Sequence, residues 1–224
     1  MPQRLEPKFD VLPAPQRQIW NALAPAPRLG FVLYGGTAIA LHLGHRRSID
    51  FDFFRSEPLD KPQIRGEFAF VKDAVVLQDT PDTLGILAEM PAGLVKISFF
   101  GNIGFGRVDA PLLTRDGVLL VASLQDLMAT KLKATLDRAE AKDYRDIAAM
   151  ISTGMSLSFG LSAFKLLFGG EPAQVLRAIG YFKDGDLNTL SQADQLLLRS
   201  ARDAVDVLPD VPLKSRSLAV PLAE

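Results

Sequence analysis

The segment SIDFDFF, residues 48–54, constrains the fold more than any other part of the chain, because its polarity alternates strictly up to Phe53. Apolar residues occupy every second position, and Asp50 and Asp52 stand between them. Successive side chains of a β-strand point to opposite faces of the sheet. A strand here therefore buries aromatic side chains on one face and presents both carboxylates on the other.

A glycine pair precedes this strand. The apolar run FVLY, residues 31–34, predicts a buried strand that stops at Gly35 and Gly36, and TAIALHLG predicts a helix that ends at Gly44. The glycines let backbone N–H groups approach a phosphate at the helix N-terminus, and the Thr37 hydroxyl would add a bond. A plain tight turn and a solvated carboxylate face are the simpler interpretations of the two features. If the two strands pair, the glycines return beside the carboxylates.

The rest of the first half predicts more sheet. A proline-bounded helix precedes the FVLY strand, and a short helix is expected near residues 58–65. Antiparallel strands are expected at 68–77, 84–90 and 94–100, and a further short strand at 118–121.

From Ser123 onward the apolar period is helical. We expect helices near 124–136, 139–152, 158–168, 172–181 and 192–207, and a loose or edge-bound tail after residue 208. The fold class is α+β, a mixed, mostly antiparallel sheet flanked by helices and followed by a C-terminal helical bundle. The expected domains are 1–122, an α/β core, and 123–224, a helical domain.

Composition narrows the class of protein. The formal net charge is −1, so nucleic-acid binding would need a local basic face. Without cysteine there is no disulfide framework and no thiolate site, and any metal must sit on oxygen or imidazole. We find neither a signal peptide nor an apolar run of the ~18 residues that span a bilayer. A cytoplasmic, soluble protein without a membrane partner is the expectation.

The carboxylate pair and the glycine pair together suit nucleotide chemistry. Mg²⁺ prefers carboxylate and phosphate oxygens, and nucleotidyl transfer needs such a cation against a triphosphate. Asp50 and Asp52 are therefore candidate Mg²⁺ ligands, and an NTP is the candidate substrate.

Two segments resemble a known family. The run GGTAIALHLGHRRSIDFDFF resembles the first motif of the AbiEii/AbiGii-type nucleotidyltransferases of the polymerase-β-like superfamily, and DLMATKLKATLDRAEAKDYRDIAAM is similar to a later lysine segment followed by K-D-x-x-D-I. The resemblance spans roughly residues 30–155. The matching positions are Gly35, Gly36, Arg46, Arg47, Asp50 and Asp52 in the first segment, and Lys131, Lys142, Asp143 and Asp146 in the second.

The resemblance implies a Mg²⁺-dependent enzyme that transfers NMP from an NTP to an acceptor hydroxyl. It further implies the toxin of a bacterial toxin–antitoxin or abortive-infection system, with RNA or tRNA as acceptor and a cognate antitoxin as partner. Arg47 and Lys131 would bind the nucleotide, and Asp143 or Asp146 would support the acceptor or the metal. The arginines at 46, 47, 138 and 145 would contact nucleic-acid phosphates.

Simpler interpretations exist for several of these side chains. The lysines at 131 and 133 suit ordinary solvated positions. Asp143 and Asp146 suit helix N-terminal charges paired with Lys142 or Arg145. The two histidines, at 42 and 45, suit surface or capping roles.

One position departs from the superfamily pattern. In LVKISFF, Ser98 occupies the place where a third carboxylate is expected. Glu89 or Asp109 would substitute, or two carboxylates hold a single Mg²⁺, or activity is altered. The alternative functions are a catalytically degenerate nucleotide-binding protein, and a transferase that modifies a small molecule such as an aminoglycoside, or a protein hydroxyl.

Overall fold

The computed structural model describes residues 3–221, which form two compact units. Residues 3–123 and 215–221 make the first unit, and residues 124–214 make the second. The expected division assigned the tail to the helical part, whereas residues 215–221 group with the first unit, where they bind an edge as an edge-bound tail would. The Arg107 N–H donates to the Ser215 carbonyl at 2.9 Å, and the Arg107 guanidinium donates to the Ser217 carbonyl at 3.0 Å. Pairing across so many residues leaves no local sequence pattern.

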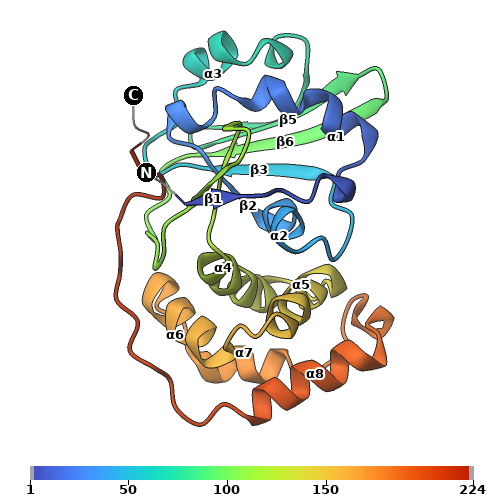
Figure 1. The fold of residues 1–224 in the computed structure, drawn as a ribbon, viewed down its shortest axis with the longest axis vertical. Coiled ribbons are helices and arrows are strands. Elements are labelled where there is room, and N and C mark those ends of the chain that lie inside the picture. The colour runs from blue at the N-terminus through green and yellow to red at the C-terminus, as the bar shows by residue number, and fades with distance from the viewer. Residues whose placement is uncertain (1–2, 222–224) are drawn as a thin grey trace. The chain divides into compact units, whose positions relative to one another are not determined.

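The first unit is built on one mixed sheet, which contains eight strands within residues 3–221 (Figure 1). Its order is β1-β7-β8-β2-β3-β6-β5-β4. The strands are β1 (Arg4–Leu5), β2 (Val32–Tyr34), β3 (Asp50–Phe54), β4 (Val75–Thr80), β5 (Thr83–Met90), β6 (Gly93–Phe100), β7 (Leu112–Thr114) and β8 (Leu120–Val121). The expected α+β class is confirmed. The very short strands β1 and β7 escaped sequence analysis, because so few residues carry no period.

Strand β3 lies inside the sheet. It pairs antiparallel with β2, which places Tyr34 beside Asp52, and parallel with β6, which places Ser98 on the other side of Asp52. The predicted pairing of the two strands around the glycine turn is therefore observed. Strands β4, β5 and β6 are antiparallel neighbours, as the sequence indicated.

Aromatic rings fill one face of this sheet. The Phe53 ring stacks on Phe99 with centroids 5.5 Å apart, and Phe31 meets Phe99 at 5.2 Å. Figure 1 shows α1 (Ala14–Ile19) and α3 (Lys61–Glu67) on the same side of the sheet. The rings explain the alternation of β3, because Phe51 and Phe53 enter this core while Phe54, on the face of the aspartates, is half-buried.

The strand expected at 68–77 is partly wrong. Residues Ala69–Val71 form the 3-10 helix η4, and the strand β4 begins only at Val75. Phe68 and Val71 are both buried, and the Phe68 ring lies 5.3 Å from that of Phe99. A helical turn brings these two side chains to the same side, where the core supplies their contacts.

The remaining helices of the first unit are short, apart from α2 (Gly35–Leu43). Helix α2 ends as predicted at Gly44, whose φ of 72° is left-handed. The 3-10 helices are η1 (Phe9–Val11), η2 (Trp20–Leu23) and η3 (Pro27–Leu29).

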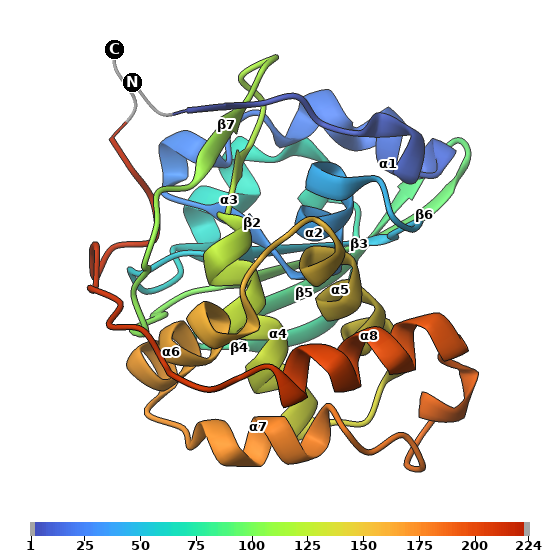
Figure 2. The same ribbon diagram turned by 60° about the horizontal axis from the view of Figure 1, so that its bottom comes forward.

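The second unit is helical, with α4 at its centre (Figure 2). Its elements are α4 (Leu124–Asp137), α5 (Ala141–Ser152), α6 (Leu157–Phe168), α7 (Pro172–Ala178), η5 (Leu187–Thr189) and α8 (Gln192–Asp203). Gly160 of α6 allows close approach to α4, because a Cβ at Gly160 would lie 2.5 Å from the Met128 side chain. Within residues 3–221, every helix is too short or too polar to cross a membrane.

Candidate functional site

The two aspartates of β3 lie on the face opposite the aromatic core. Phe51 and Phe53 are fully buried, whereas Asp50 and Asp52 are half-buried. The i and i+2 spacing on a strand separates their Cβ atoms by about 7 Å. Both carboxylates therefore lie on the same face of the sheet.

The glycine turn touches the second carboxylate. Gly35 has a φ of +74°, and a Cβ built on it would lie 2.7 Å from Asp52 Oδ2. Only glycine combines this left-handed conformation with so close an approach. The turn that opens α2 and the carboxylate of β3 thus form one continuous surface.

An arginine covers the next position of the turn. The Arg46 guanidinium packs directly against Gly36, so any side chain at Gly36 would displace it. Arg46 also donates to the Arg47 carbonyl at 3.0 Å, whereas the Arg47 side chain is exposed. The start of α2 therefore combines a helix N-terminus with the charge of Arg46, an arrangement that favours an anion.

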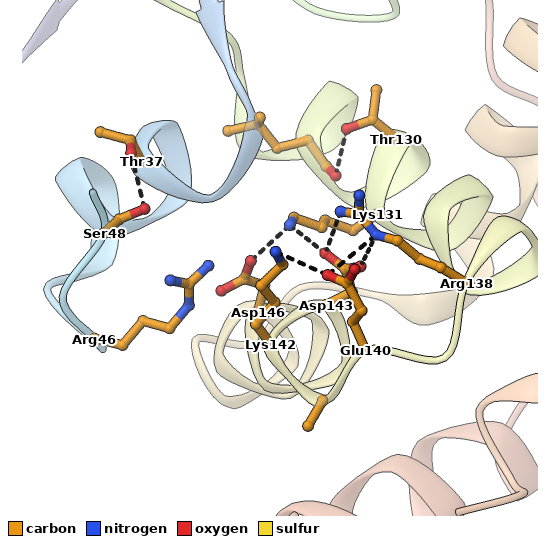
Figure 3. A network of polar contacts seen from close by, with 12 residues as sticks. Thr37, Arg46, Ser48, Thr130, Lys131, Arg138, Glu140, Lys142, Asp143 and Asp146 are labelled. Atoms are coloured by element: carbon orange, nitrogen blue, oxygen red, sulfur yellow. Dashed lines mark hydrogen bonds and ion pairs between the residues drawn. The ribbon is translucent and has the colours of Figure 1, made fainter. Parts of the chain in front are cut away.

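Thr37 has a structural task that the sequence did not predict. Its buried hydroxyl donates to the Asp50 carbonyl and lies 2.8 Å from the Ser48 hydroxyl (Figure 3). These bonds join the first turn of α2 to the start of β3.

The N-terminal segment supports the same loop. The buried Gln16 amide donates to the Ile49 carbonyl at 2.7 Å, and the Ser48 N–H donates to the Val11 carbonyl at 3.3 Å. The chain leading into Asp50 is thus held from α1 and η1. Sequence analysis missed Gln16, because a single glutamine on a helix gives no signal of its partner.

Ser98 and Lys96 complete the carboxylate face. In the parallel register of β3 and β6, Ser98 is the neighbour of Asp52 and Lys96 is the neighbour of Asp50. Register neighbours point to the same face. The strand that was expected to bring a third carboxylate therefore brings a buried hydroxyl and an exposed ammonium group.

No third acidic side chain joins Asp50 and Asp52 within residues 3–221. Glu89 lies on β5, which is separated from β3 by β6, and it pairs with Leu94 rather than with Lys96, the neighbour of Asp50. Glu89 is therefore on the order of 10 Å from Asp50. Across residues 3–221, no three His, Asp or Glu side chains gather as a metal-binding group. Within the described residues, Glu89 and Asp109 thus form no group of three with Asp50 and Asp52. Two carboxylates suit Mg²⁺, which keeps several waters and takes phosphate oxygens as its remaining ligands.

The second unit contains a charged cluster on α4 and α5, whose ion pairs Figure 3 draws. The Lys131 ammonium lies 2.6 Å from Asp143 Oδ1 and 2.8 Å from Asp146 Oδ2. Both aspartates are completely buried and Lys131 is 5% exposed. The solvated interpretation of Lys131 is wrong, and so is the pairing of these aspartates with Lys142 or Arg145. Their positions on α4 and α5 make them a buried ion-pair network.

Arg138 extends this network. Burial alone raises the pKa of Asp143, but the hydrogen bond from Arg138 at 2.8 Å and the charge of Lys131 outweigh it, so the net pKa lies below the ordinary value. Asp143 is consequently ionised at neutral pH. Lys142 instead pairs with Glu140 at 2.8 Å, and Arg145 donates to the Thr189 carbonyl at 3.0 Å.

His42 is half-buried in the first unit and binds a backbone carbonyl there. Its Nε2 lies 2.9 Å from the Ala122 carbonyl, so this nitrogen carries a proton and donates. Burial lowers the pKa of His42. The expected surface or capping role is wrong for this histidine.

We expect Thr37→Val to destabilise the first unit by about 1–3 kcal/mol, because the isosteric change leaves the Asp50 carbonyl without its donor. Thr37→Ser, which keeps the hydroxyl, should recover most of that loss. Urea denaturation of the three proteins measures the difference. Equal stability of the valine variant and the unmodified protein would contradict the assignment.

We expect Lys131→Met to cost about 3–5 kcal/mol, because it leaves two buried carboxylates without their shared cation. Lys133→Met is the matched control on the same helix. Its partner Asp137 is exposed, and loss of that pair should cost only ~0–1 kcal/mol. A Lys131 variant as stable as the Lys133 variant in thermal and urea unfolding would refute the buried network.

Comparison with known proteins adds the family. The model of the family described as nucleotidyl transferase AbiEii toxin, type IV toxin–antitoxin system, matches residues 19–210. An uncharacterized protein of Aquifex aeolicus is 31% identical over 119 residues, 52% of this chain and 55% of that protein, so the match spans about half of the relative's length.

A solved structure shares the fold. The nucleotidyltransferase toxin MenT4 of Mycobacterium tuberculosis superposes with a TM-score of 0.55 at 13% identity, covering 83% of this chain and 82% of that one. The match of the family model extends over both units and contains Gly35, Asp50, Asp52 and Lys131. The chain belongs to the AbiEii family of nucleotidyltransferase toxins.

Proposed function

We propose that the protein is a Mg²⁺-dependent nucleotidyltransferase that transfers NMP from an NTP to a hydroxyl of RNA, with tRNA as the favoured acceptor. The observation that carries this proposal is the contact of the Gly35 turn with Asp52, beside Asp50 on the same strand face. Phosphates at the N-terminus of α2 would there lie next to two metal-binding carboxylates.

In the proposed reaction, the acceptor oxygen forms a bond to the α-phosphorus while the bond from that phosphorus to the bridging oxygen breaks. Pyrophosphate leaves with that electron pair, and the acceptor proton passes to solvent. Backbone N–H groups of the Gly35-Gly36 turn and the Arg46 guanidinium bind and orient the phosphates. Asp50 and Asp52 would hold Mg²⁺, which when bound supplies charge neutralisation at the phosphates.

We assign to Arg46 the nucleotide-binding role that the sequence pattern suggested for Arg47. The sequence alone did not distinguish two adjacent arginines, but only the Arg46 side chain packs on Gly36. The exposed Arg47 is retained as a phosphate contact for the acceptor.

A role of Lys131, Asp143 and Asp146 in transfer stays a prediction. Their mutual ion pairs explain their burial without any substrate. Activity of variants in this cluster is therefore informative only when unfolding shows that the protein is still folded.

Biologically, we propose that the protein acts as the toxin of a bacterial toxin–antitoxin or abortive-infection pair, in the cytoplasm, with a cognate antitoxin as its partner. Family membership supports this role. Growth arrest on induction, relieved by the gene encoded beside it, would be the corresponding cellular observation.

The activity is tested by incubating the protein with Mg²⁺, total tRNA and each of the four α-labelled NTPs. We expect label to enter RNA from one or more NTPs, and Asp52→Asn to reduce the rate at least ~10³-fold, because electrostatic stabilisation of the phosphates is lost. Asp73→Asn is the control, since Asp73 is an exposed aspartate of the same unit. Transfer by the Asp52 variant at the unmodified rate would defeat the assignment.

Ser98 favours one rival, a protein that binds nucleotide without transferring it. Such a protein would bind Mg–NTP in calorimetry, with loss in the Asp52 variant, but would label nothing. A small-molecule or protein acceptor would instead reveal itself through transfer that survives exhaustive RNase treatment.

The metal site gives a further test. Ser98→Asp places a third carboxylate beside Asp52, and we expect the Mg²⁺ concentration for half-maximal nucleotide binding to fall by about 10-fold, because ligand charge sets affinity for hard cations. Ser98→Ala removes the hydroxyl without adding charge and should leave that concentration within about 2-fold. Identical Mg²⁺ dependence of the aspartate and alanine variants, both folded, would count against a metal on this face.

A further inference from the structure

Lys96 is an exposed lysine on the same face of the sheet as Asp50 and Asp52. It is the parallel register neighbour of Asp50 and is exposed. Within residues 3–221, the Lys96 ammonium makes no ion pair with a carboxylate. Its position beside Asp50 is fixed by the backbone, while its charge remains available.

The surroundings of Lys96 exclude one common task of strand lysines. Charged residues often protect the edge of a sheet from pairing with another chain. Strand β6, however, is enclosed by β3 on one side and β5 on the other, so Lys96 protects no edge. On the same strand face, its neighbours across the sheet are Asp50 and Leu87.

A positive charge at Lys96 would help to neutralise the negative charges of a bound triphosphate and of the two aspartates. A triphosphate carries several negative charges, and the two aspartates add to them, whereas one Mg²⁺ neutralises only part of the total. Where a third carboxylate would favour a second metal ion, this chain has Ser98, and its neighbour two residues earlier is Lys96. A lysine ammonium is a mobile point charge that suits phosphate oxygens.

We propose that Lys96 is a phosphate-binding residue of the carboxylate face, supplying next to Asp50 the positive charge that a third carboxylate and its metal would otherwise bring. The inference rests on the proposed nucleotide site. The phosphates are those of the NTP or of the acceptor backbone, because the proposed transfer would bring both to this face. Lys96 acts by binding and takes no part in bond making.

The test compares Lys96→Met, Lys96→Arg and the control Lys72→Met, an exposed lysine of the same unit. Two affinities are measured for each folded protein in the presence of Mg²⁺. Calorimetry gives the dissociation constant of an unreactive NTP analogue with a blocked α–β bridge, and fluorescence anisotropy gives that of labelled tRNA over a range of salt.

Lys96→Met should raise the dissociation constant of one of the two ligands about 10-fold or more, which is the usual effect of one lost charge-assisted bond. Lys96→Arg should restore most of that affinity, and Lys72→Met should stay within about 2-fold. Weaker nucleotide binding would show that Lys96 binds the triphosphate. Weaker tRNA binding, with the slope of log affinity against log salt concentration reduced by about one, would show that Lys96 binds the acceptor backbone.

Unchanged affinity of Lys96→Met for both ligands would overturn the proposal, as would an equal loss in the arginine variant accompanied by a lower unfolding midpoint. These outcomes are separate from failure of the transferase itself. If the unmodified protein binds the analogue but labels no acceptor, the proposed transfer is refuted. The nucleotide affinity of the Lys96 variants then still decides whether this lysine binds phosphate.

Discussion

The register of β3 between β2 and β6 is the constraint on which the rest of the first unit depends. It directs Phe53 into the ring cluster around Phe99 and turns both aspartates to the opposite face. A shift by one residue would bury the carboxylates and expose the rings, a cost of several kcal/mol for each unpaired charge. The glycine turn depends on the same register, because Tyr34 must lie beside Asp52 for Gly35 to reach the carboxylate.

The two units use charge in opposite ways. In the helical unit, Lys131 and Arg138 pair with the buried Asp143, and the Lys131 pair ties α4 to α5. In the first unit, Asp50 is half-buried beside an exposed lysine. Like charges held together without a counter-ion cost free energy. This contrast is why we place nucleotide and cation binding on the sheet, and why variants of the helical cluster need a folding control.

Ser98 determines how the site differs from a superfamily site with three carboxylates. Its hydroxyl lies beside Asp52, and no other acidic side chain within residues 3–221 completes a group of three. The consequence is a less negative face that suits a single Mg²⁺ and leaves phosphate charge to be met by basic groups. Arg46, which packs on Gly36, and Lys96, the register neighbour of Asp50, are the basic groups that we propose for this role.

The sequence by itself determined the features that are written in local patterns. Alternation set the two faces of β3, Gly44 set the end of α2, and apolar periodicity set the helices after residue 123. Tertiary structure decided the features that depend on distant partners. These are the tail that returns to Arg107, the support that Gln16 gives to the loop before Asp50, and the packing of Arg46 on Gly36. The physical reason is that the periodicity of apolar residues along a segment reports which of its faces is buried, whereas hydrogen bonds and strand register are set by groups that lie far away in the chain.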